Sequence, residues 1–456
     1  MRIIIVGVAR GSALLAKMLA ENSHDVIVVD KSQKVIDEIT DKISVNGVCG
    51  SAASRDVLLA AGADTADVLI SMVPEDETNL LACAMAKNIG TRRVIAKLER
   101  DELIGEMKYL CEKFSIDHIL TPKSLISGSI TKQIYYNAVN KVEQLFDFPV
   151  LAAELAVEND SPLVNKKLNE IKQSMGLDFM VFAVNRAGKM LVPKGNFELH
   201  RGDVIGIAAK NEEMLKLLTQ IGLMRKPVKN VTIVGGGAVG ESLARQLLSN
   251  SINVKIIEQD RERCAFLMEE LKGAQIIFGS GVDIQLMEEE KLRKADACVC
   301  LTGKDETNLL VSLIAWSNGV DSIITKIDTD SYERVLRRVT ISVTVSSDRI
   351  IAANLMEYVQ SLQSFGRFGA GESRYYQIGE AMAQICRFEI PQGFRRVGLP
   401  LYHEDMRLKK GIIIAAVLRE GSYFVPKGQD SLKVGDSIVI ISEKDNKILS
   451  LPEIFD

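Results

Sequence analysis

The 456-residue chain lacks the features that mark secreted, membrane-spanning or nucleic-acid-binding proteins. No stretch of about eighteen uncharged apolar residues occurs, and the N-terminus shows no secretion signal. The seven cysteines form no Cys-x-x-Cys motif, which favours a reducing compartment. A net charge of −4 gives no general attraction to nucleic acid or anionic lipid. These absences predict a cytoplasmic protein that does not bind nucleic acid.

Signatures of catalysis are also scarce. The four histidines lie apart, none with a partner acid or nucleophile, and no HExxH, GxSxG or Walker A sequence occurs. Tyr109 and Lys113 have the Tyr-x-x-x-Lys spacing of some dehydrogenases, but the second half has no counterpart, and we interpret the spacing as coincidence. An enzyme that transfers hydride needs a proton donor or acceptor beside its cofactor. The sequence therefore favours binding over catalysis.

The strongest signal present is a dinucleotide-binding fingerprint near the middle of the chain. The apolar segment 231–234 runs into Gly235, Gly237 and Gly240, spaced GxGxxG, and a helical pattern follows. In this arrangement the first glycine permits the turn off a strand, the second admits a pyrophosphate and the third permits close packing of the helix. The next apolar segment ends at Glu258, where the fingerprint expects an acid for the ribose hydroxyls. The alternative is a glycine-rich turn that only packs a helix on a sheet.

The chain also contains an internal duplication. The hexapeptide Asp-Glu-Thr-Asn-Leu-Leu at 76–81 recurs 229 residues later at 305–310. Farther along, Val-Pro-Lys-Gly at 192–195 recurs at 425–428. Both halves alternate strand and helix patterns and then show short β patterns separated by turns. We predict an α/β fold with two Rossmann-like, doubly wound parallel-sheet domains, each followed by a small α+β domain.

Six segments follow from these patterns. Apolar residues at helical spacing predict two connecting helices, which could also pack on a partner subunit. The predicted Rossmann-like domains are 1–123 and 227–346, the connecting helices are 124–141 and 347–371, and the small domains are 142–226 and 372–456.

The first copy of the fingerprint departs from the pattern at two of its three glycines. Gly7 is kept, but Ala9 and Ser12 stand at the second and third glycine positions. A methyl group at Ala9 would narrow the approach to a phosphate, whereas Arg10 could compensate by pairing a phosphate oxygen. The acid is retained as Asp30. We expect adenosine binding with weaker or altered pyrophosphate contacts, and the alternative is a site lost after the duplication.

The ends of later strands add further candidates, because the carboxyl ends of parallel strands line the nucleotide crevice of such folds. They are Val73, Pro74 and Lys97 in the first half and Thr302, Gly303 and Lys326 in the second. Thr302 could hydrogen-bond an adenosine, whereas Val73 at the corresponding position cannot. The two lysines could meet a phosphate, or they could be solvated strand ends. Asp76 and Asp305 are predicted to cap the following helices rather than to contact a ligand.

Taken with the repeated Asp-Glu-Thr-Asn and Pro-Lys-Gly…Gly-Asp motifs, the duplicated fingerprint resembles the TrkA family, the cytoplasmic regulatory subunits of bacterial Trk-type potassium uptake systems. The resemblance covers nearly every residue and implies two RCK N-terminal domains, each followed by an RCK C-terminal domain. It also implies binding of NAD(H) and of the adenine nucleotides ATP and ADP. The nucleotide-binding residues that it implies are Gly7, Val8, Ala9, Arg10, Gly11, Asp30, Val73, Pro74, Lys97, Gly235, Gly236, Gly237, Ala238, Val239, Glu258, Thr302, Gly303 and Lys326.

By the same resemblance the chain is expected to form a ring-shaped homotetramer and to control a separate membrane potassium-translocating subunit. Its expected place is the cytoplasm, peripheral on the inner face of the cell membrane through that partner. We predict a nucleotide-sensing switch that is not an enzyme and has no metal site. Two alternatives stay open at this point, an NAD-dependent oxidoreductase and a nucleotide sensor for a different membrane partner.

Overall fold

The chain folds into two compact units. They comprise Met1–Tyr135 with Val228–Val359, and Tyr136–Pro227 with Gln360–Asp456. The computed structural model describes residues 1–135, 141–144, 150–158, 161–223, 228–329, 332, 343–365, 371–378, 381–443 and 451–455.

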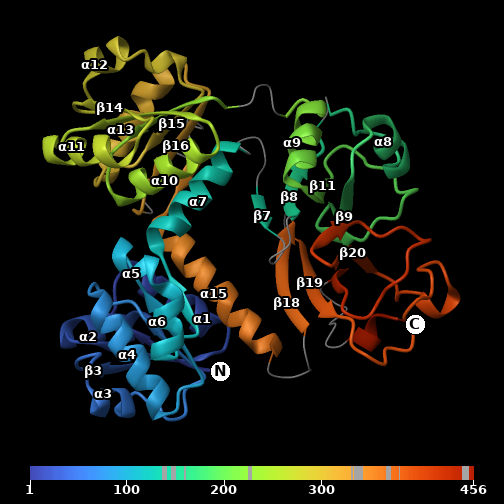
Figure 1. The fold of residues 1–456 in the computed structure, drawn as a ribbon, viewed down its shortest axis with the longest axis horizontal. Coiled ribbons are helices and arrows are strands. Elements are labelled where there is room, and N and C mark those ends of the chain that lie inside the picture. Colours follow the sequence, from blue (N-terminus) through green and yellow to red (C-terminus); the bar gives the residue numbers. More distant parts are fainter. Residues whose placement is uncertain are drawn as a thin grey trace. The chain divides into compact units, whose positions relative to one another are not determined.

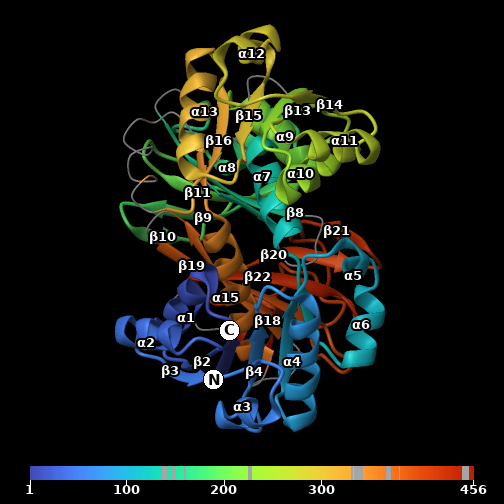
Figure 2. The same ribbon diagram turned by 90° about the vertical axis from the view of Figure 1, so that its left-hand side faces the viewer.

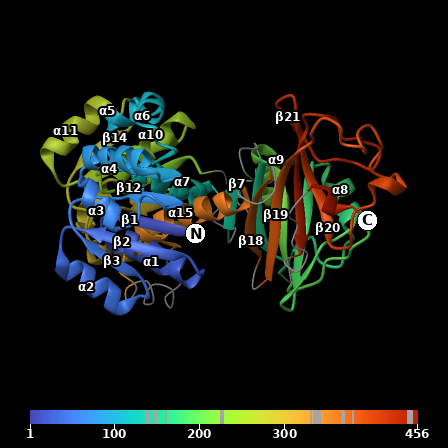
Figure 3. The ribbon, with the colours of Figure 1, turned by 90° about the horizontal axis from the view of Figure 1, so that it is seen from below.

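The first half of the larger unit is a six-stranded parallel sheet in the order β3-β2-β1-β4-β5-β6. Its strands are β1 (Arg2–Val6), β2 (Asp25–Asp30), β3 (Asn46–Cys49), β4 (Val68–Ser71), β5 (Arg93–Lys97) and β6 (His118–Leu120). Continuous apolar runs such as Ile-Ile-Ile-Val form the central strands because both faces of the sheet are covered. Figure 3 shows α1 and α2 on one face and α3 and α4 on the other. The helices are α1 (Arg10–Glu21), α2 (Gln33–Lys42), α3 (Arg55–Ala60), α4 (Asp76–Ile89), α5 (Asp101–Gly105) and α6 (Met107–Phe114).

The second half of this unit repeats the same sheet, in the order β14-β13-β12-β15-β16-β17. Its strands are β12 (Asn230–Val234), β13 (Asn253–Glu258), β14 (Gln275–Phe278), β15 (Ala297–Cys300), β16 (Ser322–Lys326) and β17 (Val343–Val345). Figure 2 shows helices on both sides of it. They are α10 (Ala238–Ser249) and α11 (Arg261–Glu270) on one side, and α12 (Ile284–Glu289) and α13 (Asp305–Ser317) on the other, with a short 3-10 turn, η1 (Leu292–Lys294), before β15. The predicted pair of doubly wound sheets is confirmed, and Cys298 and Cys300 lie fully buried in β15.

Two connecting helices pack each copy against the other. From the first copy, α7 (Pro122–Tyr135) lies along α10 of the second, where Thr131 donates to Gln246 over 3.0 Å. From the second copy, α15 (Ser347–Phe365) returns to the first, where its Tyr358 ring stacks 4.7 Å from that of His118. Figure 1 shows both helices in these positions. The face predicted for a partner subunit is therefore used, at least in part, by the other half of the same chain.

The predicted connecting helices end earlier than expected. Lys141 and Gly371, the last residues of the predicted helical segments, begin strands instead, and residues 136–140 and 366–370 of those segments lie outside the described residues.

The smaller unit holds two antiparallel five-stranded sheets, in the orders β10-β9-β11-β8-β7 and β18-β19-β22-β20-β21. The first has β7 (Lys141–Gln144), β8 (Val150–Ala156), β9 (Phe179–Arg186), β10 (Lys189–Leu191) and β11 (Val204–Lys210), with α8 (Leu168–Met175) and α9 (Asn211–Gln220). The second has β18 (Gly371–Ile378), β19 (Ala381–Glu389), β20 (Ile412–Arg419), β21 (Ser422–Phe424) and β22 (Ser437–Glu443), with the short turns η2 (Glu404–Met406) and η3 (Leu451–Ile454).

The repeated Gly-Asp motif of the small domains has a structural role. Asp203 is buried and accepts two hydrogen bonds from Arg186, at 2.8 and 2.7 Å. Asp436 repeats this arrangement with Arg419 at the same two distances. Paired charge-assisted bonds of this kind fix geometry, so each motif locks a turn onto the strand that carries its arginine.

Within the described ranges, no helix is both long enough and apolar enough to cross a lipid bilayer.

Candidate functional site

Each parallel sheet has a crevice at the carboxyl ends of its central strands. The chain winds outward in both directions from β1 in the first sheet and from β12 in the second, so the order of strands reverses beside these strands. Ligands of open α/β sheets bind at this switch point. The first crevice has a volume of about 390 Å³ and the second about 530 Å³.

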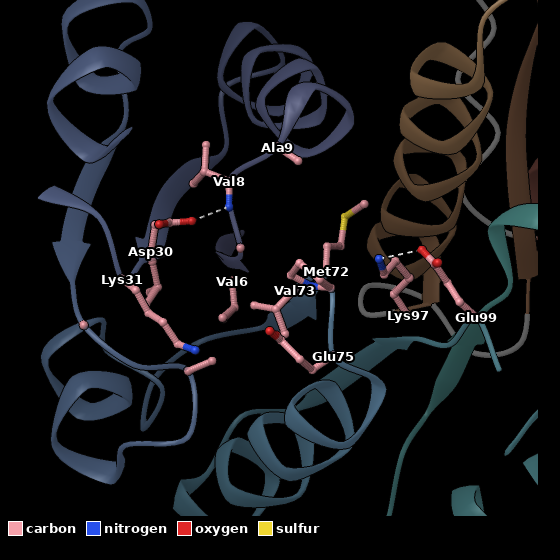
Figure 4. Close-up of a pocket in the computed structure, with 15 residues that line it drawn as sticks. Val6, Val8, Ala9, Asp30, Lys31, Met72, Val73, Glu75, Lys97 and Glu99 are labelled. Atoms are coloured by element: carbon pink, nitrogen blue, oxygen red, sulfur yellow. Dashed lines mark hydrogen bonds and ion pairs between the residues drawn. The ribbon is translucent and has the colours of Figure 1, made fainter. Parts of the chain in front are cut away.

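The first crevice gathers most of the residues predicted for it. Figure 4 shows Val8, Ala9 and Asp30 on one side and Met72, Val73 and Lys97 on the other. Of the predicted residues, those that line the crevice are Gly7, Val8, Ala9, Asp30, Val73, Pro74 and Lys97.

Arg10 and Gly11 are not among the lining residues of the first crevice. They lie in the first turn of α1, close to the start of α15. A Cβ placed on Gly11 would be 3.0 Å from the Asp348 carboxylate. Burial and the nearby Asp328 raise the pKa of Asp348, and Arg10 and Lys326 oppose this rise. Arg10 thus lies outside the lining of the first crevice, and the phosphate contact predicted for it stays a prediction.

The second crevice is lined by nearly all its predicted residues. They are Gly235, Gly237, Ala238, Val239, Glu258, Thr302, Gly303 and Lys326. Gly236 does not line it, because its peptide is turned toward Glu258, which accepts the Gly236 N–H over 2.7 Å. Gly236 thus shapes the loop rather than the crevice surface.

The three fingerprint glycines of the second copy are required for different reasons. Gly235 has φ +109°, and a Cβ there would lie 2.6 Å from the carbonyl oxygen of Leu301. A Cβ at Gly240 would lie 2.2 Å from the carbonyl oxygen of Gly235. A Cβ at Gly237 would meet no protein atom within 4 Å. The fold itself therefore excludes side chains at the first and third positions, whereas the second faces the open crevice.

The first copy replaces the third glycine by a serine that closes the loop. The buried Ser12 hydroxyl donates to the carbonyl of Gly7 over 2.8 Å and accepts the N–H of Ala9 over 2.7 Å. The sequence shows only that a serine stands at the third glycine position. The structure shows a hydroxyl that hydrogen-bonds both ends of the turn.

The two predicted ribose acids hold their glycine loops. Asp30 accepts the N–H of Val8 and that of Ser32, each over 2.9 Å. Glu258 accepts the N–H of Gly236 over 2.7 Å and that of Asp260 over 2.9 Å. A carboxylate oxygen can accept more than one hydrogen bond. Each acid can therefore accept from a ribose hydroxyl while it still binds the loop.

Two asparagines that sequence reasoning missed join the strand ends beneath the crevices. The buried Asn308 side chain accepts the N–H and the hydroxyl of Thr302, each over 2.7 Å, and donates to the carbonyls of Thr302 and Lys326 over 3.1 and 2.9 Å. Asn79 makes the corresponding bonds to Ser71, Val73 and Lys97 in the first copy. The repeated Asp-Glu-Thr-Asn motif was the signal that could have identified them. The Thr302 hydroxyl, predicted to contact adenosine, is already bonded to Asn308.

The aspartates of the same motif do not cap their helices, contrary to the sequence prediction. Asp76 accepts the N–H groups of Glu99 and Arg100, at distances from 2.9 to 3.1 Å. Asp305 does the same for Asp328 and Thr329, at 2.9 to 3.3 Å. Neither helix has a side-chain cap. Each aspartate instead hydrogen-bonds the loop that leaves the neighbouring strand, because that loop crosses directly beside the helix start.

Lys97 and Lys326 are neither free nor fully solvated. The Lys97 side chain is only 12% exposed and its ammonium lies 2.8 Å from Glu99. The Lys326 ammonium lies 2.9 Å from Asp328. Both line their crevices, so of the two readings left open by the sequence the solvated strand end does not describe them, and the phosphate contact stays a prediction. An incoming phosphate would have to share or displace the paired carboxylate.

Among the described residues, no histidine lines either crevice, and no cluster of His, Cys, Asp and Glu could hold a metal ion. His24 is buried and His118 stacks on Tyr358, so both belong to the packed interior. Tyr109 and Lys113 lie on α6 and line neither crevice. The two crevices thus offer glycine loops, acids and lysines.

Comparison with protein families gives matches to both kinds of domain. The TrkA-N domain model matches residues 3–122 and 231–347, together more than half of the chain, and the TrkA-C domain model matches 152–222.

Relatives of similar length occur in bacteria and archaea. The chain is 28% identical over 448 residues to the Trk system potassium uptake protein TrkA of Vibrio alginolyticus, covering 96% of this chain and 95% of that protein. It is 28% identical over 458 residues to the TrkA homolog of Archaeoglobus fulgidus, covering 100% of both.

Solved structures share the fold. The GsuK channel bound to NAD superposes with a TM-score of 0.62 at 17% identity, covering 97% of this chain and 77% of that one. The crystal structure of the GsuK RCK domain gives 0.61 at 18% identity, covering 97% and 92%. At this level of identity the likeness concerns the fold alone.

Proposed function

The chain belongs to the TrkA-N domain family, and we propose that it is a nucleotide-sensing regulatory subunit that gates a membrane potassium transporter of the Trk type. Its ligands on this proposal are NAD(H), ATP and ADP, bound in the two crevices. On this proposal the subunit has two arrangements in equilibrium, and a ligand shifts this equilibrium toward the arrangement that binds it more tightly. The free energy of that shift cannot exceed the difference between the ligand's binding free energies in the two arrangements.

The observation that carries the proposal is the position of Gly237. The fold has room for a side chain there, yet the residue is glycine and lies in the crevice lining. A pyrophosphate on the N-terminus of α10 would require this space, because the phosphates of such sites lie against the loop backbone. The neighbouring Glu258 stands where the ribose hydroxyls would lie.

Two further parts of the proposal concern the membrane partner and the assembly of the protein. Proteins similar over the full length are named Trk system potassium uptake proteins, which supports a membrane potassium-translocating subunit as the partner. A cytoplasmic homotetramer, peripheral to the membrane through that partner, is the assembly we propose. Crosslinking of the full-length protein and its co-purification with the transporter would test both.

An oxidoreductase would need a group that relays protons beside the nicotinamide. The lysines that line the crevices are each paired with a carboxylate, which disfavours this role. Incubation with NADH and a panel of carbonyl compounds is expected to give no turnover. Sustained NADH oxidation that depends on Glu258 or Lys326 would instead make the protein an enzyme.

We expect Glu258→Ala to weaken nucleotide binding more than Asp30→Ala does. Both changes remove a ribose acceptor and leave two backbone N–H groups without their partner, but the second crevice keeps the glycine that admits a pyrophosphate. About tenfold weaker NADH binding for Glu258→Ala, and a smaller change for Asp30→Ala, should be measured by calorimetry. The opposite order would refute this ranking of the two crevices.

The test of the function as a whole is a flux experiment. The purified protein should first be profiled for NAD, NADH, ATP and ADP binding, and then combined with its transporter in vesicles. Potassium flux that changes with nucleotide, and only when the regulatory chain is present, is the expected result. Flux that is indifferent to every nucleotide that binds would exclude the gating role.

A further inference from the structure

A network of charged side chains surrounds the glycine loop of the second crevice. Arg263 of α11 lies 2.6 Å from one oxygen of Glu241, and Arg245 lies 2.9 Å from the other. Arg245 also pairs with Glu270 over 2.6 Å. The network joins the first turn of α10 to α11 behind the crevice, and Arg263 and Glu241 are not among the crevice lining.

Arg263 holds the loop itself. Its Nε donates to the carbonyl of Gly236 over 2.7 Å, while Glu258 accepts the N–H of the same residue over 2.7 Å. The guanidinium also lies 4.7 Å from the Phe266 ring, on which it stacks. Gly236 is therefore held from both sides, and the orientation of the peptides that lead into α10 is set before any ligand arrives.

Glu241 makes Arg263 necessary for a second reason. It is the fourth residue of α10, in the turn on which a phosphate would bind, and its side chain is only 12% exposed. An unpaired carboxylate there would repel a phosphate strongly, because the two negative charges would be close together and only partly screened by water. With both oxygens bound by arginine, that charge is compensated.

The first copy provides an internal comparison. Val35 stands at the position of Arg263 and Ala13 at that of Glu241, so neither charge is present. Its loop is closed by Ser12 and by the Asp30 bond to Val8, and both of these contacts come from the βαβ unit itself without an arginine. The two copies thus share one fold but hold their loops by different means.

We propose that Arg263 is a positioning residue that sets the second crevice as the tighter nucleotide site. It orients the glycine loop and neutralises Glu241, and both effects favour a pyrophosphate on α10. The inference rests on the proposed nucleotide binding and extends it, because it assigns the difference between the two sites to a residue that touches no ligand.

The test uses the full chain with Ala9→Val throughout, which is expected to obstruct a phosphate in the first crevice, and NADH as the probe. Arg263→Val is expected to weaken binding about tenfold, and Arg263→Val with Glu241→Ala, the pair found in the first copy, to regain most of that loss. Arg261→Val is the matched control, since Arg261 stacks on Phe278 and, in the part of the chain that the structure describes, forms no hydrogen bond or ion pair with the loop. The NADH affinity of the Arg261→Val variant should equal that of the parent, which is the chain that carries Ala9→Val alone.

Amide hydrogen exchange of residues 236–240 without nucleotide gives a second readout. Faster exchange in Arg263→Val than in the parent and in Arg261→Val supports the inference, as does recovery of affinity in the double variant. Unchanged NADH affinity in Arg263→Val, or a double variant no better than the single one, overturns it. A parent that binds no nucleotide would refute the proposed function, whereas the exchange rates would still report whether Arg263 holds the loop.

Discussion

Gly237→Val is expected to weaken nucleotide binding in the second crevice strongly without unfolding the protein. The isopropyl group would project into open space, because no protein atom lies within 4 Å of the position of a Cβ there, and the backbone at φ −63° suits any residue. A phosphate on the start of α10 would collide with it. Forcing extra methyl groups into an occupied space costs about 1–3 kcal/mol, so affinity should fall about 10- to 100-fold.

Calorimetry with NADH and a thermal melt of the ligand-free protein measure the two halves of this prediction. Gly105→Val, in an equally open position at the end of α5, serves as the control and should alter neither quantity by much. The converse change, Ala9→Gly, is expected to tighten binding in the first crevice. Full NADH affinity in Gly237→Val would mean that the phosphates lie elsewhere.

Asn308→Ala is expected to destabilise the larger unit more than any other single change considered above. Removing the amide leaves the N–H, hydroxyl and carbonyl of Thr302 and the carbonyl of Lys326 without their present partner. Buried polar groups left without a hydrogen bond cost about 1–3 kcal/mol each. Partial relaxation should hold the total near 3 kcal/mol, equivalent to a fall in Tm of about 5–10 °C.

Calorimetric melting of the full-length protein checks this expectation, with Asn318→Ala as the matched control. Asn318 ends the same helix but donates only to Ile314, one turn back, so its loss should cost less than about 1 kcal/mol. Asn79→Ala should resemble Asn308→Ala, because the first copy has the same set of bonds. If the Asn308 and Asn318 variants melted alike, the asparagine would not be the link between β15 and β16.

The sequence predicted the fold well because the relevant signals are local or repeated. Alternating apolar runs and helical patterns lie within single elements, and the recurrence of the same motifs in the second copy strengthened each pattern by a second observation. The crevice residues were found for the same reason, since the glycine loop and the acid that follows it belong to one βαβ unit. The bounds of the six segments stay predictions at the level of single residues.

Errors arose where a side chain reaches across the chain. Asp76 stands before a helix and reads as a cap, yet its partners are N–H groups more than twenty residues away, after β5. The sequence leaves Lys97 open between a phosphate contact and a solvated strand end, because the strand pattern does not show that its ammonium pairs with Glu99, two residues farther on. The role of Ser12 was missed because a hydroxyl that replaces a glycine can either obstruct a turn or close it. Only the hydrogen-bond geometry separates these outcomes.

Helix α7 of the first copy packs on the second copy, and α15 of the second copy packs on the first. Because both copies belong to one polypeptide, their sequences can differ. In a homodimer whose two subunits packed on one another through such helices, both subunits would have the same sequence. Any substitution would then appear in both subunits at once. Joining the two in one polypeptide removes that constraint. One copy then holds Gly237, Gly240 and Arg263 while the other holds Ala9, Ser12 and Val35 at the corresponding positions. On the proposed function, such a difference would let a single molecule respond to two ligands, or to one ligand over two concentration ranges.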